Sequence, residues 1–447
     1  MVTVDQALIG IGKSLSSRLS ADRIRRVCLE VGHTWREREL DPVKTVHMFI
    51  HQILNGNTSC QDLPRITGEN VTGSAYCQAR SRLPLNVLQQ LVQDVDAALG
   101  ATRHSLRRWH GHRVAILDGS GFSMPDTDEL RAHFGQPGGQ AEGCGFPSAH
   151  LLLMIDAGTH TIRDMAVSPL RTHDLSQVSA LHPLLAEEDI ALGDRAFCSY
   201  VHLALCLQGR RHGVFRAHQR MIIDFTPHRP RAEGKTNPQR RPYSRWIRSL
   251  GKDDQLVEWF KPAQKPDWIR QDEYDRLPAS IVVRELRYRI RTPGCRTGEV
   301  TLVTTLLDAK KYPAPELARL YGIRWDIETD LKHLKTTMGL DVLKCKTVEG
   351  VMKEAMAFVL VYNLVRTVMI EAGRRQKVDA QRISFVDALR WLKHAPPGSD
   401  LPALVVNPLR PHRAEPRVRR RRPKEFPVMK KPRDQLRREL LTVGHEA

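Results

Sequence analysis

The spacing of apolar residues along the chain predicts a helical beginning, followed by strands that alternate with helices. Over residues 84–99 apolar side chains recur at helical spacing, with a proline near the start and a glycine just beyond the end. Shorter amphipathic patterns predict helices at 23–31 and 42–54. We therefore interpret residues 1–105 as a helical N-terminal domain.

After this domain the pattern changes to short apolar runs separated by turn residues. Strands are expected at 114–117, 150–155, 161–167 and 189–192, and a helix at 199–208. The first and last of these strands end in a carboxylate, Asp118 and Asp194. Strand ends are where α/β sheets place their chemistry. For either aspartate alone, a turn-forming or helix-capping role is the alternative.

The second half of the chain begins with a basic, irregular stretch that contains three tryptophans and fits an insertion better than a continuation. After it, the expected elements are a strand at 299–306 and long helices at 313–338 and 349–372. Strands interleaved with helices predict an α/β core interrupted by the insertion. The expected parts of the chain are 1–105, 106–216, 217–298, 299–375 and 376–447.

Charge indicates the class of partner. The 447 residues include 69 Lys and Arg against 50 Asp and Glu, a formal net charge of +19. The surplus gathers at 210–250 and 405–438. A solvated, flexible surface is one interpretation of the second cluster, but two such clusters also suit binding to DNA phosphates. A polyanion, and first of all nucleic acid, is therefore the expected partner.

Several classes of protein are disfavoured. The longest apolar run, Ala355–Tyr362, is too short to span a membrane, and no secretion signal is apparent. The eight cysteines are scattered singly without a C-x-x-C pair, which is typical of a reducing cytoplasm. Neither an H-E-x-x-H zinc motif nor a phosphate-binding P-loop occurs. We expect a cytoplasmic protein without a membrane span.

The helix expected at 313–338 carries a polar stripe. At about 100° per residue, Tyr321, Arg324, Glu328 and Lys335 fall within about 60° of one another. One face then presents a single carboxylate between two cations, with a phenol behind. An exposed face stabilised by an ion pair such as Arg324–Glu328 is the alternative.

Three separated carboxylates in a basic protein suggest a site for divalent metal ions. Asp118, Asp194 and Glu328 supply the oxygen ligands that Mg²⁺ prefers, and Mg²⁺ is commonly held by one or two carboxylates plus substrate phosphate. Two such ions can activate a water or hydroxyl and stabilise the leaving oxygen. The sequence therefore favours metal-assisted phosphoryl chemistry.

Three motifs resemble one known family. Residues 321–335 reproduce the pattern Y-x2-R-x3-E-x6-K. Upstream, 117–120 with 125–127 is similar to a first-aspartate block, and 193–197 to a second. The three blocks occur in the expected order. Together they resemble the bacterial DDE transposases of insertion-sequence family four, in the branch with the Tyr-Arg-Glu-Lys signature.

The resemblance implies a ribonuclease-H-like catalytic core interrupted by a mostly β insertion, with a helical N-terminal domain and a basic helical C-terminal region. It also implies two Mg²⁺ or Mn²⁺ ions, cleavage at the ends of a mobile element and joining of its 3′-hydroxyls to target DNA. The residues implied as metal ligands are Asp118, Asp194 and Glu328. Those implied as contacts to DNA phosphates are Tyr321, Arg324 and Lys335.

Further implications of the resemblance concern assembly of the protein on DNA and the route of DNA cleavage. Residues 1–105 would help bind the terminal inverted repeats, and 376–447 would support a dimer in the synaptic complex on double-stranded DNA. Family members that form a DNA hairpin place a tryptophan in the strand before the signature helix, and 299–306 has none. This strand therefore does not support the hairpin route of cleavage, whereas the metal chemistry is unaffected. The alternatives are a non-catalytic DNA-binding inhibitor of transposition and a ribonuclease-H-like nuclease without strand transfer.

Overall fold

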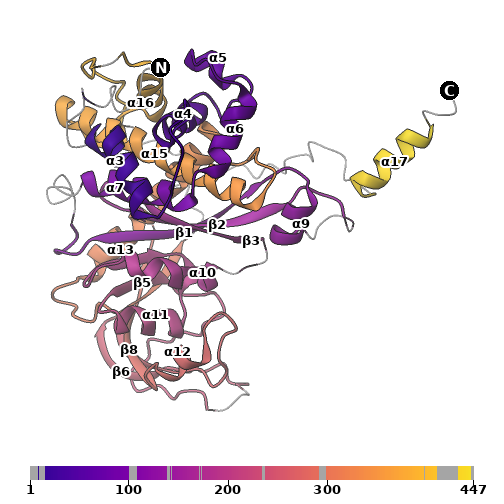
Figure 1. Ribbon diagram of the computed structural model, residues 1–447. Coiled ribbons are helices and arrows are strands. Elements are labelled where there is room, and N and C mark those ends of the chain that lie inside the picture. Colours follow the sequence, from indigo (N-terminus) through magenta and orange to yellow (C-terminus); the bar gives the residue numbers. More distant parts are fainter. Residues whose placement is uncertain are drawn as a thin grey trace.

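A large mixed β-sheet with helices on both faces organises the protein (Figure 1). This computed structural model describes residues 9, 16–99, 108–137, 141, 143–170, 172, 174–233, 237–290, 298–396, 398–409 and 431–443. The arginine run 419–422, and most of the basic cluster 405–438, lie outside these residues.

Five strands form the first half of the sheet. They are β1 (Val114–Ser123), β2 (Ser148–Asp156), β3 (Ile162–Pro169), β4 (Ile190–Gly193) and β5 (His212–Arg216). Their order is β3-β2-β1-β4-β5, with β1, β2 and β3 antiparallel and β1, β4 and β5 parallel. This mixed topology fits a ribonuclease-H-like core. The hairpin expected from 150–155 and 161–167 is confirmed as β2 and β3.

The sheet continues through β9 (Glu299–Thr304), which pairs antiparallel with β5. Three strands of the 217–298 stretch then extend it in the order β9-β8-β7-β6. They are β6 (Arg245–Gly251), β7 (Asp254–Phe260) and β8 (Ser280–Arg289), with the short helix α12 (Gln271–Asp275) beside them. The buried ion pair between Arg284 and Asp254 ties β8 to β7. This stretch therefore enlarges the core sheet.

Helices of the N-terminal region cover one face of the sheet, above it in Figure 1. They are α3 (Ala21–Glu30), α4 (Pro42–Leu54), α5 (Leu63–Thr67), α6 (Gly73–Arg82) and α7 (Leu85–Ala98), after a 3₁₀ turn at Ser17–Leu19. Side chains of Ser20, Asp41 and Thr72 cap α3, α4 and α6 by accepting a backbone N–H bond. The helices expected at 23–31, 42–54 and 84–99 are confirmed.

The central helix on this face is α15 (Val348–Gln376), which packs against α7 and α4. By length and composition it is apolar enough to cross a membrane, but 94% of its apolar window is buried inside the protein. It is therefore a core helix. It is followed by a 3₁₀ turn (Ala380–Arg382) and by α16 (Phe385–His394).

The opposite face is covered by α10 (Asp174–Leu181) and α11 (Tyr200–Gln208). Two 3₁₀ turns, η2 (His182–Leu184) and η3 (Arg195–Phe197), precede and follow β4.

Two sequence expectations need correction. Asp118 does not end its strand, because β1 runs on to Ser123 and pairs with β2 over that length. This pairing outweighs the low strand propensity of the two glycines within β1. The helix expected at 313–338 is divided into α13 (Ala314–Gly322), a 3₁₀ turn (Ile323–Trp325), α14 (Asp326–Lys332) and a π-helical turn (His333–Thr337).

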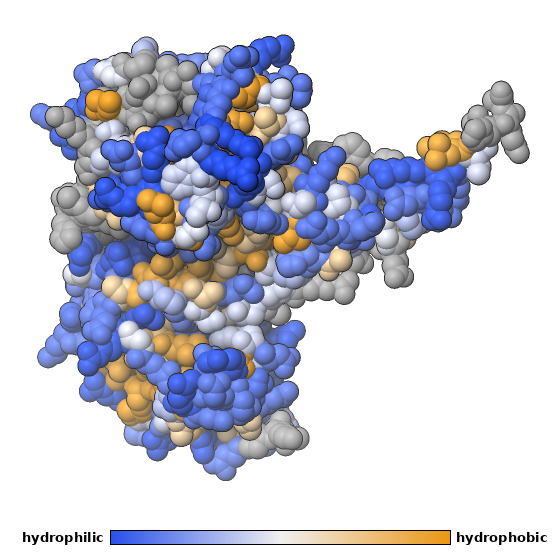
Figure 2. Space-filling model, in the orientation of Figure 1, coloured by the Kyte–Doolittle hydropathy of each residue, from blue (hydrophilic) through white to orange (hydrophobic). Residues whose placement is uncertain are grey.

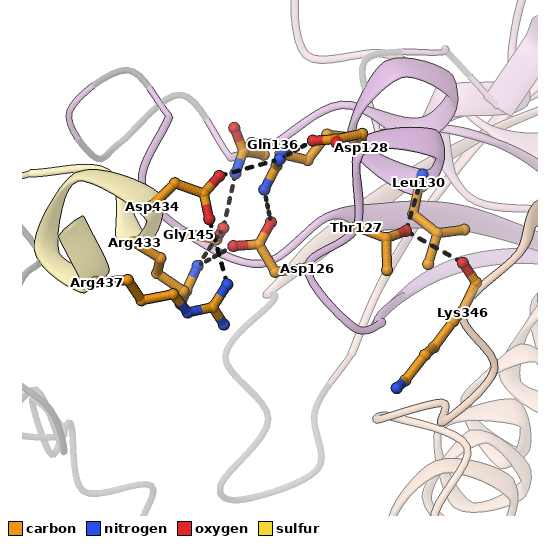
Figure 3. Close-up of polar contacts among 11 residues, drawn as sticks. Asp126, Thr127, Asp128, Leu130, Gln136, Gly145, Lys346, Arg433, Asp434 and Arg437 are labelled. Carbon is orange, nitrogen blue, oxygen red and sulfur yellow. Dashed lines mark hydrogen bonds and ion pairs between the residues drawn. The ribbon is translucent and has the colours of Figure 1, made fainter. Parts of the chain in front are cut away.

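The C-terminal helix α17 (Arg433–Val443) extends away from the body (Figure 1). Its first turn is held near α9 (Asp128–Phe134), where Arg433 donates hydrogen bonds to Asp126 and to the carbonyl of Gly145, both at 2.9 Å (Figure 3). Figure 2 shows apolar side chains gathered toward the far end of this helix. There Leu440 and Leu441 are 73% and 70% exposed.

Candidate active site

Two aspartates lie side by side where the parallel pairing of β1 and β4 ends. The last paired residues are Leu117 and Gly193, and Asp118 and Asp194 follow them directly. Neighbouring strands are about 4.8 Å apart, and equivalent residues of parallel strands point to the same face. Asp118 and Asp194 therefore share the face that α15 covers.

Backbone hydrogen bonds orient both carboxylates. Asp194 Oδ1 accepts the N–H of Ala196 at 2.7 Å and so caps η3. Asp118 Oδ1 accepts the N–H of Gly119 at 3.0 Å. The capping role considered for Asp194 is thus real, and it fixes the side chain beside Asp118.

Glu328 lies on α14, which packs against β1. Its side chain is exposed, whereas Ile327 and Asp330 on the other side of the helix are buried. On one side of Glu328, Lys335 Nζ donates a hydrogen bond of 3.0 Å to Ser120 Oγ of β1. On the other side, Tyr321 is close enough to Asp194 for that charge to act on its phenol.

The three carboxylates lie on β1, directly after β4 and on α14, and they do not form a closed cluster. Groups of three ligand atoms that all lie within 4.8 Å of one another occur elsewhere in the described chain, and Asp118, Asp194 and Glu328 are not among them. Mg²⁺ keeps several waters and is held by one or two carboxylates plus substrate phosphates. The adjacent oxygen donors on β1 and β4 therefore fit such an ion, with Glu328 on the facing helix.

Arg324 does not pair with Glu328, contrary to the exposed-face alternative. Within the described ranges its guanidinium makes no ion pair, and its Nε is buried without a hydrogen-bond partner. The guanidinium lies 5.7 Å from the ring centre of Tyr321 and 5.4 Å from that of Trp325. A cation held by aromatic rings is available to an external anion.

Burial raises the pKa of Tyr321, and the nearby Asp194 adds to this effect while Arg324 and Arg216 oppose it. Burial likewise raises the pKa of Tyr288 to about 12. Both phenols are therefore neutral hydrogen-bond donors at neutral pH, and Tyr321 is a buried support beneath Arg324.

Arg216 is a site residue that sequence reasoning missed. It ends β5, whose Phe215 pairs with Gly193, so Arg216 lies next to Asp194 across the sheet. Among the described residues it has no carboxylate within ion-pair distance. Its sequence signal was slight: a cation that closes a short apolar run.

Two histidine clusters also escaped sequence analysis, because their members are far apart along the chain. In one, His182, His202 and Cys206 lie together and buried. The Nε2 atoms of the two histidines are 3.0 Å apart, and His202 Nδ1 lies 2.9 Å from the carbonyl oxygen of Phe197. Burial lowers the pKa of His182 to about 3 and that of His202 to about 4. The cluster is therefore a neutral, hydrogen-bonded part of the core.

In the other cluster, His112 lies near Glu188 and His212, where β1 and β5 begin and therefore at the other end of the strands from the two aspartates. Both ring nitrogens of His112 are occupied, Nδ1 by the carbonyl of Glu188 at 2.6 Å and Nε2 by the hydroxyl of Tyr312 at 2.7 Å. These bonds join the start of β1 to the segment before α13, which is a structural role.

Two of the three tryptophans of the 217–298 stretch, Trp259 and Trp268, pack in an apolar cluster. Trp259 is 8% exposed and donates its indole N–H to Glu285 at 3.0 Å. Trp268 packs against the same apolar cluster. Burial raises the pKa of Glu285, although its hydrogen bonds from Trp259 and Gln255 oppose this.

The chain is similar in sequence to known transposases. A family described as "Transposase DDE domain" matches residues 109–364. The chain is 26% identical over 383 residues to the transposase InsG for insertion sequence element IS4 of Escherichia coli strain K12, covering 81% of this chain and 79% of that protein. It is 25% identical over 260 residues to the putative transposase InsZ of the same strain, covering 58% and 79% respectively. A cryo-electron microscopy structure of the piggyBac transposase synaptic complex with hairpin DNA matches at a TM-score of 0.41 and 10% identity, covering 87% of this chain and 79% of that chain.

Proposed function

The chain belongs to the DDE-domain transposases and is a metal-dependent DNA transposase of the bacterial IS4 family, and we propose that it binds the terminal inverted repeats of its element, cleaves the ends and joins the 3′-hydroxyls to target DNA. The observation that carries this proposal is the adjacency of Asp118 and Asp194 where β1 and β4 stop pairing, with Glu328 on the facing helix.

We assign Asp118, Asp194 and Glu328 as the ligands of two Mg²⁺ or Mn²⁺ ions. Such ions, when bound, activate the attacking oxygen and stabilise the leaving oxygen of the phosphodiester. The protein's own task is to hold the ligands. The cap on η3 orients Asp194, and the contact of Lys335 with Ser120 helps to keep the helical segment of Glu328 against β1.

The cations around the carboxylates would bind the DNA backbone. Within the described residues Arg324 and Arg216 have no carboxylate partner, and Lys335 lies at the end of the same stripe as Arg324. An arginine can grip a phosphate through two parallel hydrogen bonds, whereas a lysine acts as a point charge. Tyr321 supports Arg324 through its ring. The DNA strand is thus held by Arg216, Arg324 and Lys335 around the metal-binding carboxylates.

The remaining regions serve end recognition and assembly in this proposal. Residues 1–105 contribute to binding of the ends, 217–298 is the insertion between the two parts of the core, and 376–447 supports a dimer in the synaptic complex. The net charge of +19 favours association with nucleoid DNA in the bacterial cytoplasm.

The test is cleavage of a DNA duplex carrying the element end, in the presence of Mg²⁺. Asp194→Asn keeps the size of the side chain but removes its charge, so cleavage should fall at least a hundredfold while end binding without metal is retained. Asp267→Asn, an exposed aspartate of the insertion, is the matched control and should cleave normally. Normal cleavage by Asp194→Asn would refute the site.

A second assay separates transposase from nuclease. Pre-cut ends with a free 3′-hydroxyl should be joined to a target plasmid by the unsubstituted protein and not by Asp194→Asn. Cleavage without any joining would favour a nuclease, and specific end binding without nicking would favour a non-catalytic inhibitor.

A further inference from the structure

The helix that carries Glu328 also carries a buried charge. Asp330 is two residues further along α14 and 2% exposed, whereas Glu328 is exposed on the other side of the helix. Burying an ionised carboxylate is costly unless it is paired and hydrogen-bonded. An apolar residue would have met the packing requirement here at less cost, so the presence of an aspartate calls for a reason.

His160 is the direct partner of Asp330. Its Nδ1 donates a hydrogen bond of 2.7 Å to Asp330 Oδ2, and the imidazole is itself 4% exposed. His160 stands in the turn between β2 and β3 with φ of 59°, a left-handed conformation that is uncommon outside glycine. The turn thus holds the imidazole in a fixed position toward α14.

Two side chains of α15 complete the surroundings. Arg366, 1% exposed, donates through Nη2 to the carbonyl of Thr159 at 3.2 Å, and its charge acts on Asp330. Tyr362 is fully buried beside Asp330, and burial together with that negative charge holds the pKa of Tyr362 well above 10.

These contacts fix the position of the Asp330 carboxylate. Its hydrogen bond from His160 is 2.7 Å long and joins two side chains that are almost fully buried. Hydrogen bonds weaken steeply as their angle bends, so this bond favours one direction of approach.

The direction of this hydrogen bond affects the orientation of α14 because this helix is short. It has seven residues and lies between a 3₁₀ turn and a π-helical turn, so its rotation about its own axis is not set by a long regular helix. Apolar contacts such as that of Ile327 are non-directional and tolerate a change of rotation. A hydrogen bond between two buried side chains does not tolerate such a change, because its strength depends on its angle.

We propose that Asp330 and His160 are positioning residues, whose buried bond fixes the rotation of α14 and thereby directs Glu328 toward Asp118 and Asp194. This inference rests on the proposed role of Glu328 as a metal ligand. It extends the site to a layer of side chains that touches neither metal nor DNA.

The primary experiment measures the dependence of end cleavage on Mg²⁺ for Asp330→Leu, which removes the acceptor of the hydrogen bond and keeps the branching of the side chain. A misdirected Glu328 should raise the half-saturating Mg²⁺ concentration at least tenfold and lower kcat, with little change in KM for the DNA end. Calorimetric titration of the protein–DNA complex with Mn²⁺ should show the same loss of metal affinity. Unchanged metal dependence in a folded Asp330→Leu protein would overturn the proposal.

The matched control is Asp254→Leu, which breaks the buried Asp254–Arg284 ion pair of β7 and β8. It should lower thermal stability without shifting the Mg²⁺ requirement. If both variants shift that requirement equally, the role of Asp330 is only structural and the proposal fails.

Two variants of His160 keep the test decisive if Asp330→Leu does not fold. Asparagine adopts the left-handed conformation readily, and its side-chain N–H can donate in place of Nδ1, so His160→Asn should restore near-normal metal dependence. His160→Ala removes the donor and should raise the Mg²⁺ requirement. Identical behaviour of the two variants would contradict the proposal.

A double variant separates this inference from the assignment of the site. In a Glu328→Gln background, Asp330→Leu should have no further effect on Mn²⁺ affinity, because the ligand that Asp330 positions is already lost. If Glu328→Gln alone leaves Mn²⁺ affinity unchanged, the proposed metal site is wrong. If Glu328→Gln lowers affinity and Asp330→Leu does not, only the positioning role is wrong.

Discussion

At the scale of single residues, the site is distinguished by two arginines that have no carboxylate partner among the described residues. Many arginines of this chain pair with a carboxylate, as Arg113 does with Asp189 at 2.6 Å. Arg324 and Arg216 do not do so within the part of the chain that the structure describes. Since both lie near the carboxylates that we propose as metal ligands, we expect them to bind a phosphate of the DNA, and this expectation can be measured.

The first prediction concerns Arg216→Gln. A protein that loses one phosphate contact releases about one counterion fewer on binding, so the slope of log K against log salt should become shallower by about 0.9. Binding to an element end should be measured over a range of salt concentrations without divalent metal. Arg210→Gln is the control, because Arg210 is exposed, pairs with Glu187 and lies before the other end of β5. An identical slope for both variants would exclude a phosphate contact by Arg216.

Single residues of the candidate site differ in whether the sequence alone could identify them. Asp118, Asp194 and Glu328 could be proposed because each stands in a local pattern, two after apolar runs and one on a helical stripe. Arg216 and the His160–Asp330 pair could not, because their roles arise from strand register and from contacts between residues 170 positions apart. No local pattern records such a contact.

At the scale of elements, the junction between β4 and η3 positions Asp194. A Cβ atom on Gly193 would lie 2.7 Å from Cδ2 of Phe197. Phe197 is fully buried in the apolar cluster between the sheet and α11, so it has no room to move aside. Glycine at 193 therefore allows the chain to turn tightly from the strand into the 3₁₀ turn that Asp194 caps.

Gly193→Ala should disturb this junction. Overpacking of this kind costs about 1–3 kcal/mol of unfolding free energy, and a displacement of Asp194 by about 1 Å could cost about a hundredfold in cleavage rate. Thermal unfolding and Mg²⁺-dependent end cleavage should be measured side by side. In the control Gly209→Ala the new Cβ meets only the flexible end of Arg211, so both properties should change little. Full activity of Gly193→Ala would show that the junction is not tight.

Most elements could be predicted from the sequence, and the exceptions have physical causes. Helices such as α7 and α15 follow from apolar spacing alone. The length of β1 could not be predicted, since its second half is a strand only because β2 pairs with it. The division of the signature helix depends on packing, where π-helical His333 stacks on Phe385 of α16 at 4.2 Å. Tertiary contacts decided both cases.

At the scale of the molecule, one sheet joins β1 and β4 to the strands of the 217–298 stretch through β5 and β9. The C-terminal helix α17 behaves differently. It has 11 residues and is held at its first turn, where Arg433 pairs with Asp126 and lies 3.9 Å from the ring centre of Phe146. An isolated helix of this length is marginal in water. We therefore expect its apolar face to pack against another protein surface. In the proposed synaptic dimer, a second copy of the chain supplies that surface.

The last prediction tests that role of α17. Pairing of two copies across a two-fold axis would bury Leu440 and Leu441 of each chain, so every substitution acts twice in the assembly. The double variant Leu440→Glu, Leu441→Glu should convert the DNA-bound dimer to monomers while leaving the unfolding temperature and the binding of a single end unchanged. Sedimentation velocity with a duplex carrying one element end measures the assembly. Arg437→Gln, Arg438→Gln makes the same change in net charge on exposed positions of the same helix and should keep the dimer. A dimer that survives the leucine substitutions would assign the interface to another part of the chain.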